Sequence, residues 1–418
     1  MKPIKVILIG AGDRGNAYAA YALNNQEDIQ IVGVAEPDPA RREQFRKKYD
    51  LAEADCLDTW EAVFERDKWA DAVMICTSDN LHYVPTMKAI SQGYHILLEK
   101  PMTPSEQECI DIAEAAQKAN VKVVVCHVLR YSPFFESIKK IIDSGEIGDV
   151  VTIMHSENVL DVHHAHSFTR GNWRNTAESS PMILAKSCHD MDILQWLVGK
   201  KCVALSSFGS LKFFCKDYCP PNAPPRCTDG CEVDCPYDAR KLYAKGGQWV
   251  RILAAGNYSV TNEEVDAIFK TDEDIHEALK TSPYGRCVFQ CDNDVVDHQV
   301  VNLLFEDDVT VSFTMTSFTP DMSRSIKVMG TKGEIKGHTS KKELIVTNFV
   351  TREKREEPVV AVGGHGGGDI GIMIAFCKYL RGEIGPEEVS EARISALNHR
   401  LCFKAEESRL AGGALIQL

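Results

Sequence analysis

The chain has 418 residues, of which 44% are hydrophobic and 26% are charged, and its formal net charge is -13. This length suffices for two domains with substantial cores, while the negative charge and the lack of a long Lys/Arg run argue against nucleic acid or an anionic membrane as a partner. The apolar runs are short, so we expect neither a transmembrane span nor a signal peptide, and we expect a cytoplasmic protein.

The first predicted element is a strand over Ile4–Ile9, which is apolar at every position but one. A run of this kind is typical of a strand that is buried on both faces at the centre of a parallel sheet. A G-x-G-x-x-G turn follows at once and opens a helix, the arrangement that binds a dinucleotide pyrophosphate. The residues of this turn that we expect to contact the cofactor are Gly10, Gly12, Asp13, Arg14 and Gly15.

A second apolar strand, Ile29–Ala35, ends in Glu36, about twenty residues beyond the last glycine of the turn. A carboxylate in this position holds the hydroxyls of the adenosine ribose and favours NAD over NADP. Arg41 and Arg42 lie a helical turn further on and keep NADP open as the alternative cofactor.

Strands and helices then alternate as far as residue 126, which predicts an α/β domain with a doubly wound parallel sheet. The expected elements are helices 40–49, 59–65, 81–92 and 105–120 and strands 71–76, 94–98 and 121–126. Ligands of such sheets bind beyond the carboxyl ends of the strands. That rule selects Thr77, Asp79, Asn80, His82, Glu99, Lys100, Pro101, His127 and Arg130.

The pattern changes from about residue 150, where alternating strands are separated by long polar loops. We expect a second domain over 127–385, of α+β type with a mostly antiparallel sheet, and a C-terminal helix in 386–418 that packs back on the body. Its expected elements are strands 151–157, 300–305, 310–316 and 325–330, a helix over 183–198, a Cys-rich insertion over about 213–262, and final helices over 370–381 and 390–411.

Lys100 is the first candidate for chemistry, because it follows a predicted strand at the mouth of the nucleotide cleft. Burial or a nearby positive charge can lower a lysine pKa toward neutrality and make the side chain a general acid or base. The alternative is a surface ion pair with Glu99.

The sequence resembles the Gfo/Idh/MocA family of oxidoreductases over nearly its whole length. The resemblance rests on GAGDRG, on segment 77–82, on Glu99-Lys100-Pro101, on His189-x-x-Asp192 and on the strand and turn over 327–334. It implies a Rossmann domain, a second domain whose open sheet mediates dimers or tetramers, and hydride transfer between a nicotinamide and a carbohydrate or polyol hydroxyl. It also implies that Lys100 and His189 are catalytic and that both reach the hydroxyl being oxidised.

The segment around His189 departs from the family pattern, in which many members have an aspartate four residues before the histidine, where this chain has Ala185. On one continuous helix, Lys186, His189 and Asp190 would share a face. We therefore expect Lys186 and Asp190 to be catalytic together with His189, with Asp190 supplying the missing negative charge.

The loop over 161–174 is rich in His, Arg and Trp, residues that bind sugar hydroxyls and stack on pyranose faces. We interpret it as a substrate lid; metal ligation by its three histidines and a plain polar surface loop are the alternatives. The expected substrate-binding residues are Arg130, His166, Arg170, Trp173 and Arg174, and His365 and Asp369 in the Gly-rich segment 363–369 are weaker candidates.

The insertion carries five of the fifteen cysteines, at 215, 219, 227, 231 and 235. Because a loop-rich segment of this kind lacks apolar residues to hold itself together, we consider a structural zinc bound by Cys219, Cys227, Cys231 and Cys235. Paired C-x-x-C knuckles are absent, so an iron-sulfur cluster, disulfides and free thiols stay open. The other cysteines are expected to be reduced.

The sequence thus predicts an NAD-dependent dehydrogenase of a sugar, glycoside or polyol, with Asn80 and Glu99 near the nicotinamide ribose, acting as a homo-oligomer. One alternative is an NAD-retaining glycosidase that works by transient oxidation and elimination. Another is a non-catalytic NAD-binding regulator. Net production of NADH distinguishes the dehydrogenase from the glycosidase and the regulator.

Overall fold

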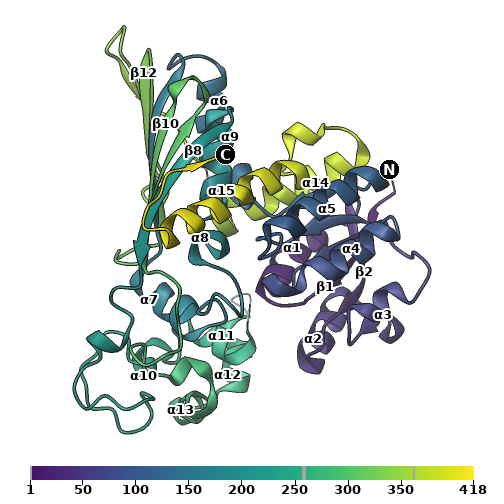
Figure 1. Cartoon of the computed structure of the whole chain (residues 1–418). Helices are drawn as coiled ribbons and strands as arrows, with labels where there is room; N and C mark the ends of the chain where they lie inside the picture. The colour runs from purple at the N-terminus through teal and green to yellow at the C-terminus, as the bar shows by residue number, and fades with distance from the viewer. Residues whose placement is uncertain (1, 257–259, 361–362) are drawn as a thin grey trace. The chain divides into compact units, whose positions relative to one another are not determined.

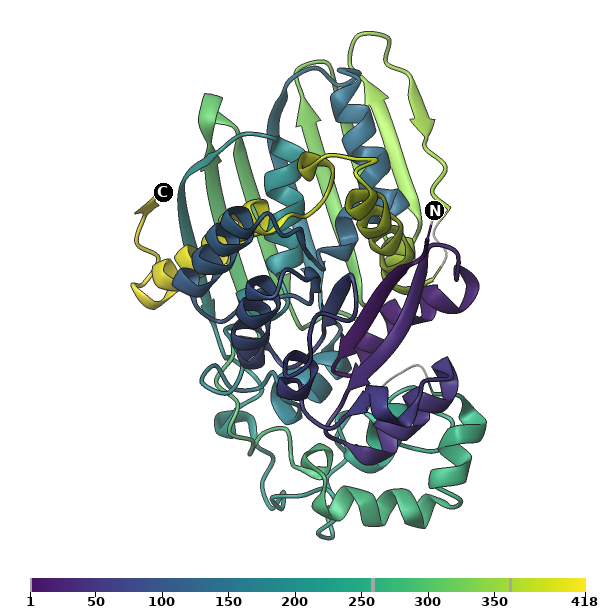
Figure 2. The same cartoon turned by 90° about the vertical axis from the view of Figure 1, so that its right-hand side faces the viewer.

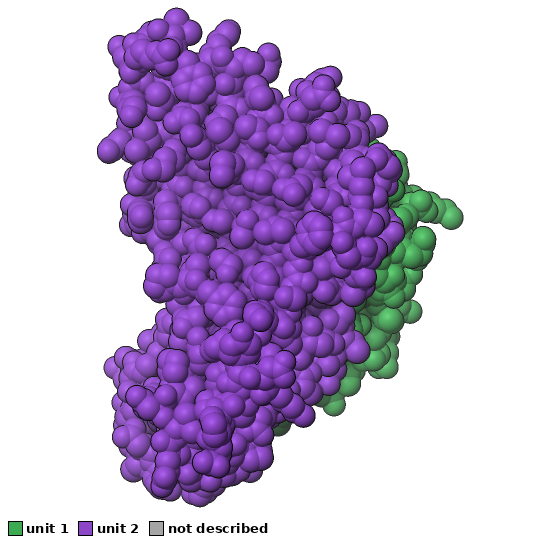
Figure 3. Space-filling model, turned by 60° about the vertical axis from the view of Figure 1, so that its left-hand side comes forward, with its two compact units in different colours: residues 1–132, 362–400 green, residues 133–361, 401–418 purple. Residues whose placement is uncertain are grey.

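The computed structural model describes residues 2–256, 260–360 and 363–418. The chain divides into two compact units, coloured separately in Figure 3: Met1–Ser132 with Val362–Arg400, and Pro133–Ala361 with Leu401–Leu418. The domain boundaries predicted from the sequence are at residues 126 and 385, whereas the chain changes units after residues 132, 361 and 400. The difference arises because Ile372, Met373 and Phe376 join the same apolar cluster as the first strand, which assigns their helix to the first unit.

The first unit is built on a parallel sheet with strand order β3-β2-β1-β4-β5-β6 among the residues described. Its elements are β1 (Ile4–Ile9), α1 (Asp13–Asn24), β2 (Ile29–Ala35), α2 (Pro39–Tyr49), β3 (Cys56–Leu57), α3 (Glu61–Phe64), β4 (Ala72–Ile75), α4 (Tyr83–Ser91), β5 (His95–Leu98), α5 (Glu106–Ala119), β6 (Val123–Val125) and α14 (Gly368–Arg381). Strand β1 lies between β2 and β4, which explains its buried apolar sequence. The predicted doubly wound parallel sheet is confirmed, and its topology places a ligand site beyond the carboxyl ends of β1 and β4.

The second unit contains one large sheet with strand order β14-β13-β12-β11-β7-β10-β9-β8-β15 in the described part of the chain. Only the β7–β10 pair in this order is parallel, so the predicted mostly antiparallel sheet is confirmed. Its strands are β7 (Val150–Asn158), β8 (Cys202–Ser210), β9 (His298–Phe305), β10 (Thr310–Thr316), β11 (Ser323–Gly330), β12 (Gly333–His338), β13 (Glu343–Asn348), β14 (Lys354–Glu356) and β15 (Ile416–Gln417).

The helices of the second unit fall into two groups. Helices α6 (Pro133–Asp143) and α9 (Cys188–Val198) lie along one face of the sheet, as Figures 1 and 2 show. The others are α7 (Asp161–His164), α8 (Met182–Ala185), α10 (Ala239–Leu242), α11 (Val250–Ala255), α12 (Asn262–Ile268) and α13 (Asp272–Thr281). The last long helix, α15 (Ala392–Leu410), contributes residues to both units.

The strands of the large sheet alternate between buried and exposed residues. In β9 the exposed positions include Val300 and Leu304, and the strand pairing puts Met154 of β7 and Phe208 of β8 on the same face. This face is therefore partly apolar, and the opposite face packs against the helices. None of the helices in the described ranges is long and apolar enough to cross a membrane.

Candidate functional site

The glycine-rich turn after β1 has the geometry of a dinucleotide cradle. Gly10 has a φ of +92°, and a Cβ there would lie 2.7 Å from the Cys76 carbonyl oxygen. A Cβ on Gly15 would lie 2.2 Å from the Gly10 carbonyl oxygen, whereas a Cβ on Gly12 would meet no protein atom within 4 Å. Gly10 and Gly15 are thus required by the fold itself, but Gly12 leaves open space in front of the helix N-terminus, where a pyrophosphate fits.

Glu36 fixes the position of this turn. Its buried carboxylate accepts hydrogen bonds from the backbone N–H of Ala11 at 2.8 Å and of Asp38 at 3.0 Å. Arg42, from the first turns of α2, donates to the Glu36 backbone oxygen. The acid at the end of β2 therefore ties the glycine-rich turn to the strand beside it, at the edge where a ribose would bind.

Arg14 is the centre of a charged cluster at the start of α1. It donates to Glu99 at 3.1 Å and to Asp369 at 2.6 Å, and its guanidinium lies over the ring of Tyr18. His365 lies 3.0 Å from Asp369. Burial alone would raise the pKa of Asp369, but the hydrogen bond from His365 and the charge of Arg14 outweigh it and lower that pKa. Asp369 thus belongs to the nucleotide-side cluster rather than to a substrate lid.

Glu99 and Lys100 follow β5 at the same edge of the sheet. The Glu99 carboxylate also accepts hydrogen bonds from the hydroxyl of Tyr18 at 2.7 Å and from the backbone N–H of Lys100. These bonds keep Glu99 buried and fix the backbone that carries the partly exposed Lys100 side chain. The peptide bond from Lys100 to Pro101 is cis.

The loop after β4 is joined to the loop after β5 by His82. One of its ring nitrogens lies 2.8 Å from the Pro101 carbonyl oxygen, and the other lies 3.0 Å from that of Thr77. Asn80 is exposed between them, and Arg130, after β6, is buried. The structure therefore gathers the cofactor residues predicted in the first unit at one edge of its sheet.

The predicted helix over 183–198 is broken, which corrects the expected side-chain arrangement. Helix α8 ends at Ala185 and α9 begins at Cys188, with Lys186 capping the first helix and Ser187 the second. Because the helical register restarts at Ser187, Lys186 does not share a helix face with His189 and Asp190. His189 itself lies in the first turn of α9 and is 5% exposed.

Asp190 lies in a buried ion cluster rather than at an open catalytic surface. It accepts hydrogen bonds from His155 Nε2 at 2.7 Å and from Arg324 Nε at 2.8 Å, and its side chain has no exposed surface. Arg324 also pairs with Glu157 on β7, and Lys186 Nζ lies 3.5 Å from Glu157 Oε1. Burial alone would raise the pKa of Asp190, but Arg324 and His155 outweigh it and lower that pKa.

We expect Asp190→Asn to destabilise the second unit by about 3–5 kcal/mol, because it removes one of the two buried carboxylates that balance Arg324 and Lys186. The matched control is Asp292→Asn, which changes a half-exposed partner of Arg174 and should cost no more than about 1 kcal/mol. Urea unfolding of both variants measures the difference. Equal midpoints would contradict the interpretation of the cluster as a core ion pair.

The segment over 161–174, predicted as a loop, begins with α7 and a second helical stretch over Ala165–Arg170, and it packs into an aromatic core. His166 is hydrogen-bonded to the Tyr243 hydroxyl at 2.7 Å and stacks on Tyr284, and burial lowers its pKa to about 3. His164 is hydrogen-bonded to Ser317 at 2.6 Å, and burial lowers its pKa to about 4. These histidines are therefore neutral at physiological pH.

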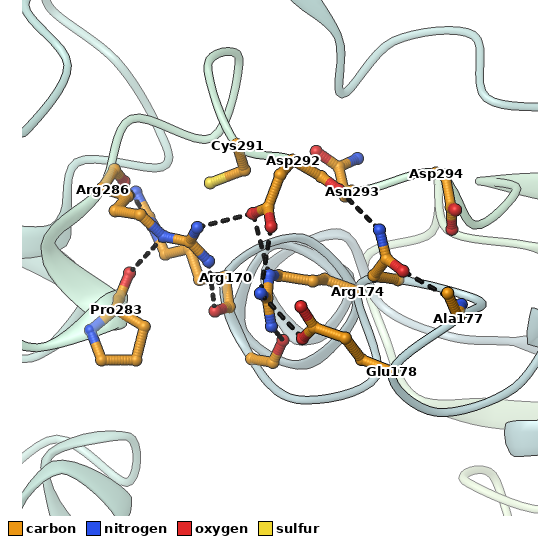
Figure 4. Close-up of polar contacts among 12 residues, drawn as sticks. Arg170, Arg174, Ala177, Glu178, Pro283, Arg286, Cys291, Asp292, Asn293 and Asp294 are labelled. Atoms are coloured by element: carbon orange, nitrogen blue, oxygen red, sulfur yellow. Dashed lines mark hydrogen bonds and ion pairs between the residues drawn. The ribbon is translucent and has the colours of Figure 1, made fainter.

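The arginines of this segment form hydrogen bonds and ion pairs with other residues of the protein, as Figure 4 shows for Arg174. Arg170 has no exposed surface and donates to the carbonyl oxygens of Arg286 at 2.7 Å and Tyr237 at 2.7 Å. Arg174 pairs with Asp292 at 2.9 Å and with Glu178, and Arg286 pairs with the same aspartate from its other side. Arg170 thus has no surface with which to touch a substrate. Of the predicted lid residues, Trp173 and Arg174 are both partly exposed, and Trp173 lies next to Phe168.

The predicted zinc site at Cys219, Cys227, Cys231 and Cys235 is not supported. Within residues 2–256, 260–360 and 363–418 no three His, Cys, Asp or Glu side chains are placed to hold a metal ion, and the cysteines are free thiols. The premise that the insertion lacks apolar residues was wrong. Two clusters hold it, one around Tyr243, Trp249 and Phe269 and one around Phe214, Tyr237 and Phe289.

Two family models match the chain. The model described as "Oxidoreductase family, NAD-binding Rossmann fold" matches residues 4–127, and the one described as "Oxidoreductase family, C-terminal alpha/beta domain" matches residues 139–361. The fold and the glycine-rich turn therefore define an NAD-binding oxidoreductase. The chain belongs to the Gfo/Idh/MocA family.

Individual relatives agree with this assignment. The Bacillus subtilis protein YteT, named as an oxidoreductase, is 25% identical over 81% of this chain and 80% of its own length. The 2,7-anhydro-N-acetylneuraminate hydratase of Escherichia coli is 25% identical over 46% of this chain and 49% of its own, so that match spans about half of each protein. Among solved structures, an inositol dehydrogenase homologue from Azotobacter vinelandii, complexed with NAD+, covers 100% of this chain and 98% of its own at 14% identity and a TM-score of 0.72.

Proposed function

We propose that the protein is an NAD-dependent dehydrogenase that acts on a hydroxyl of a sugar, glycoside or polyol. The observation that carries the proposal is the cradle at Gly12, held in place by Glu36, with Lys100 at the same edge of the sheet. The solved relative complexed with NAD+ is named for an inositol, which supports a polyhydroxylated substrate. Arg42 beside Glu36 keeps NADP as the second cofactor to be measured.

In this proposal a bound nicotinamide supplies the hydride acceptor. Lys100 and His189 take part in removing the hydroxyl proton, because amine and imidazole side chains are among the groups that act as general acids and bases in enzymes. Arg130 and Trp173 contact the substrate. Gly10, Gly12, Gly15 and the residues of the β4 and β5 loops hold the cofactor.

The test is reduced-nicotinamide absorbance with NAD or NADP and a panel of sugars, polyols and glycosides, with aglycone release read in the same wells. Absorbance that rises with one substrate class supports the dehydrogenase. Product without accumulated NADH supports a second, redox-neutral reading, which the hydratase among the relatives favours. If the protein binds the cofactor but neither NADH absorbance nor aglycone release rises, the proposed activity is overturned and a regulator is favoured.

We also propose that the chain forms a homo-oligomer through the exposed face of the large sheet, where the side chains of Met154 and Phe208 are more than half exposed. A lysine at position 154 would place a charge in that interface, so Met154→Lys is expected to lower the mass measured by light scattering to that of one chain. Val350→Lys, at an exposed position outside this face, is the control. An unchanged mass for Met154→Lys would contradict the proposed interface.

A further inference from the structure

The ion cluster under α9 contains two buried carboxylates that share one guanidinium. Arg324 donates to Asp190 through Nε and is also in contact with Glu157, and neither carboxylate side chain has exposed surface. One cation cannot neutralise two buried anions, and an uncompensated buried charge is costly. The charge is balanced either by a proton on one of the carboxylates or by a second positive group.

Lys186 is in the position to be that group. Its ammonium nitrogen lies 3.5 Å from Glu157 Oε1, and its side chain is 17% exposed, so it lies at the outer side of the cluster. In the chain it precedes His189 by three residues, in the break between α8 and α9. Glu157 thus joins the buried cluster to the segment that carries the proposed proton acceptor.

We propose that Glu157 is a positioning residue that keeps Lys186 charged and fixed in the break between α8 and α9, three residues before His189 in the chain, so that its ammonium stabilises the negative charge developing on the substrate oxygen. This inference rests on the proposed dehydrogenase function. In that reaction the hydroxyl proton goes to His189, the hydride goes to the nicotinamide, the carbon–oxygen double bond forms, and Lys186 keeps its protons. A fixed cation in a partly buried site stabilises such charge without reorganisation.

The charges around Glu157 give the arrangement a pH dependence. Burial raises the pKa of Glu157, with Arg324 and Lys186 opposing the rise and Asp190 adding to it. The fourth neighbour, His155, donates to Asp190. Above this pKa Glu157 is charged and holds Lys186, whereas below it Glu157 takes a proton and its attraction for the ammonium is lost.

The first experiment needs no enzymatic activity. The rate at which Lys186 is acetylated by acetic anhydride, followed by mass spectrometry across pH, gives the pKa of that amine. Glu157→Gln removes the neighbouring anion, so we expect the Lys186 pKa to fall by about one unit, which is a tenfold faster acetylation near pH 8. Glu157→Asp keeps the charge and should stay near wild type. An unchanged pKa in Glu157→Gln, with both variants shown to be folded by thermal melting, would overturn the proposal.

The second experiment uses turnover in the full-length enzyme. Glu157→Gln is expected to lower kcat at least about tenfold with KM changed by no more than about threefold, and Glu157→Asp should recover part of the loss. Glu334→Gln, which removes the carboxylate of the Lys327 ion pair in the same sheet, is the control and should be neutral. If wild type reduces no nicotinamide with any substrate, the proposed function fails, while the acetylation result still decides whether Glu157 governs Lys186. Wild-type kcat in Glu157→Gln would overturn the positioning role.

Discussion

Replacing Lys100 by methionine is expected to lower kcat for NAD reduction by about 10²- to 10⁴-fold, the usual contribution of a positioned acid or base. The substitution should preserve the hydrogen bond to Glu99, because Glu99 accepts it from the backbone N–H of residue 100, which methionine also provides. Steady-state turnover of the best substrate from the panel measures the effect. Lys118→Met, on the exposed surface of α5, is the matched control and should be neutral.

His189→Asn tests the other proposed proton acceptor in the same assay. Asparagine keeps a polar side chain of similar reach but cannot exchange a proton near neutrality. We expect a loss of similar size to that of Lys100→Met, with NAD affinity unchanged. If both variants keep wild-type turnover, the dehydrogenase assignment must be abandoned.

The second large effect concerns the glycine-rich turn, where two glycines should respond differently to the same substitution. Gly12→Val should fold normally, because a Cβ there meets no protein atom and the backbone φ is -73°, yet it should weaken NAD binding at least about 100-fold by filling the cradle. Gly15→Val should lose folding stability as well, since its Cβ would lie 2.2 Å from the Gly10 carbonyl oxygen.

Calorimetric titration with NAD and thermal melting of the same samples separate these two outcomes. A Gly12→Val protein that melts like wild type and binds NAD like wild type would show that the dinucleotide does not lie over this turn. A Gly15→Val protein with normal melting would show that the packing between the turn and α1 can adjust.

The first unit was the easier of the two to predict from sequence. The predicted strands over 4–9 and 29–35 have the observed bounds, because each is an apolar run that ends at the turn residues of a βαβ unit. Strand β3 was missed, since two residues, Cys56 and Leu57, carry no periodicity. The site residues on this unit follow from topology alone, as the carboxyl ends of parallel strands share an edge.

Several strands of the second unit carry no clear pattern. Strand β12 contains Gly333 and Gly337, which are poor strand formers, and Gly337 is needed because the Phe134 ring lies 2.6 Å from where its Cβ would be. A tertiary contact thus sets the residue type, and no local rule predicts it. The break between α8 and α9 at Ser187 could not be predicted from the sequence either, because the residues on both sides favour helix.

The ion cluster was also missed, although one signal was present. Glu157 falls on the same side of its predicted strand as the buried Ile153, and a charged residue at an inward position requires a partner. That partner, Arg324, lies 167 positions away in the chain, and only strand pairing between β7 and β11 brings the two together. The cysteine content of the insertion led to a wrong prediction, a zinc site. The aromatic residues that hold the insertion in place were given too little weight.

The aromatic clusters of the insertion bear on how this enzyme can be engineered. Phe214 and Tyr237 pack with Ala165 from the loop before it and with Phe289 from the segment after it. The insertion is therefore part of the core and cannot be excised as a cassette. A chain from which residues 213–262 had been removed would expose the apolar side chains that pack against them, and those side chains would have to be replaced by polar ones to keep the shortened protein from aggregating.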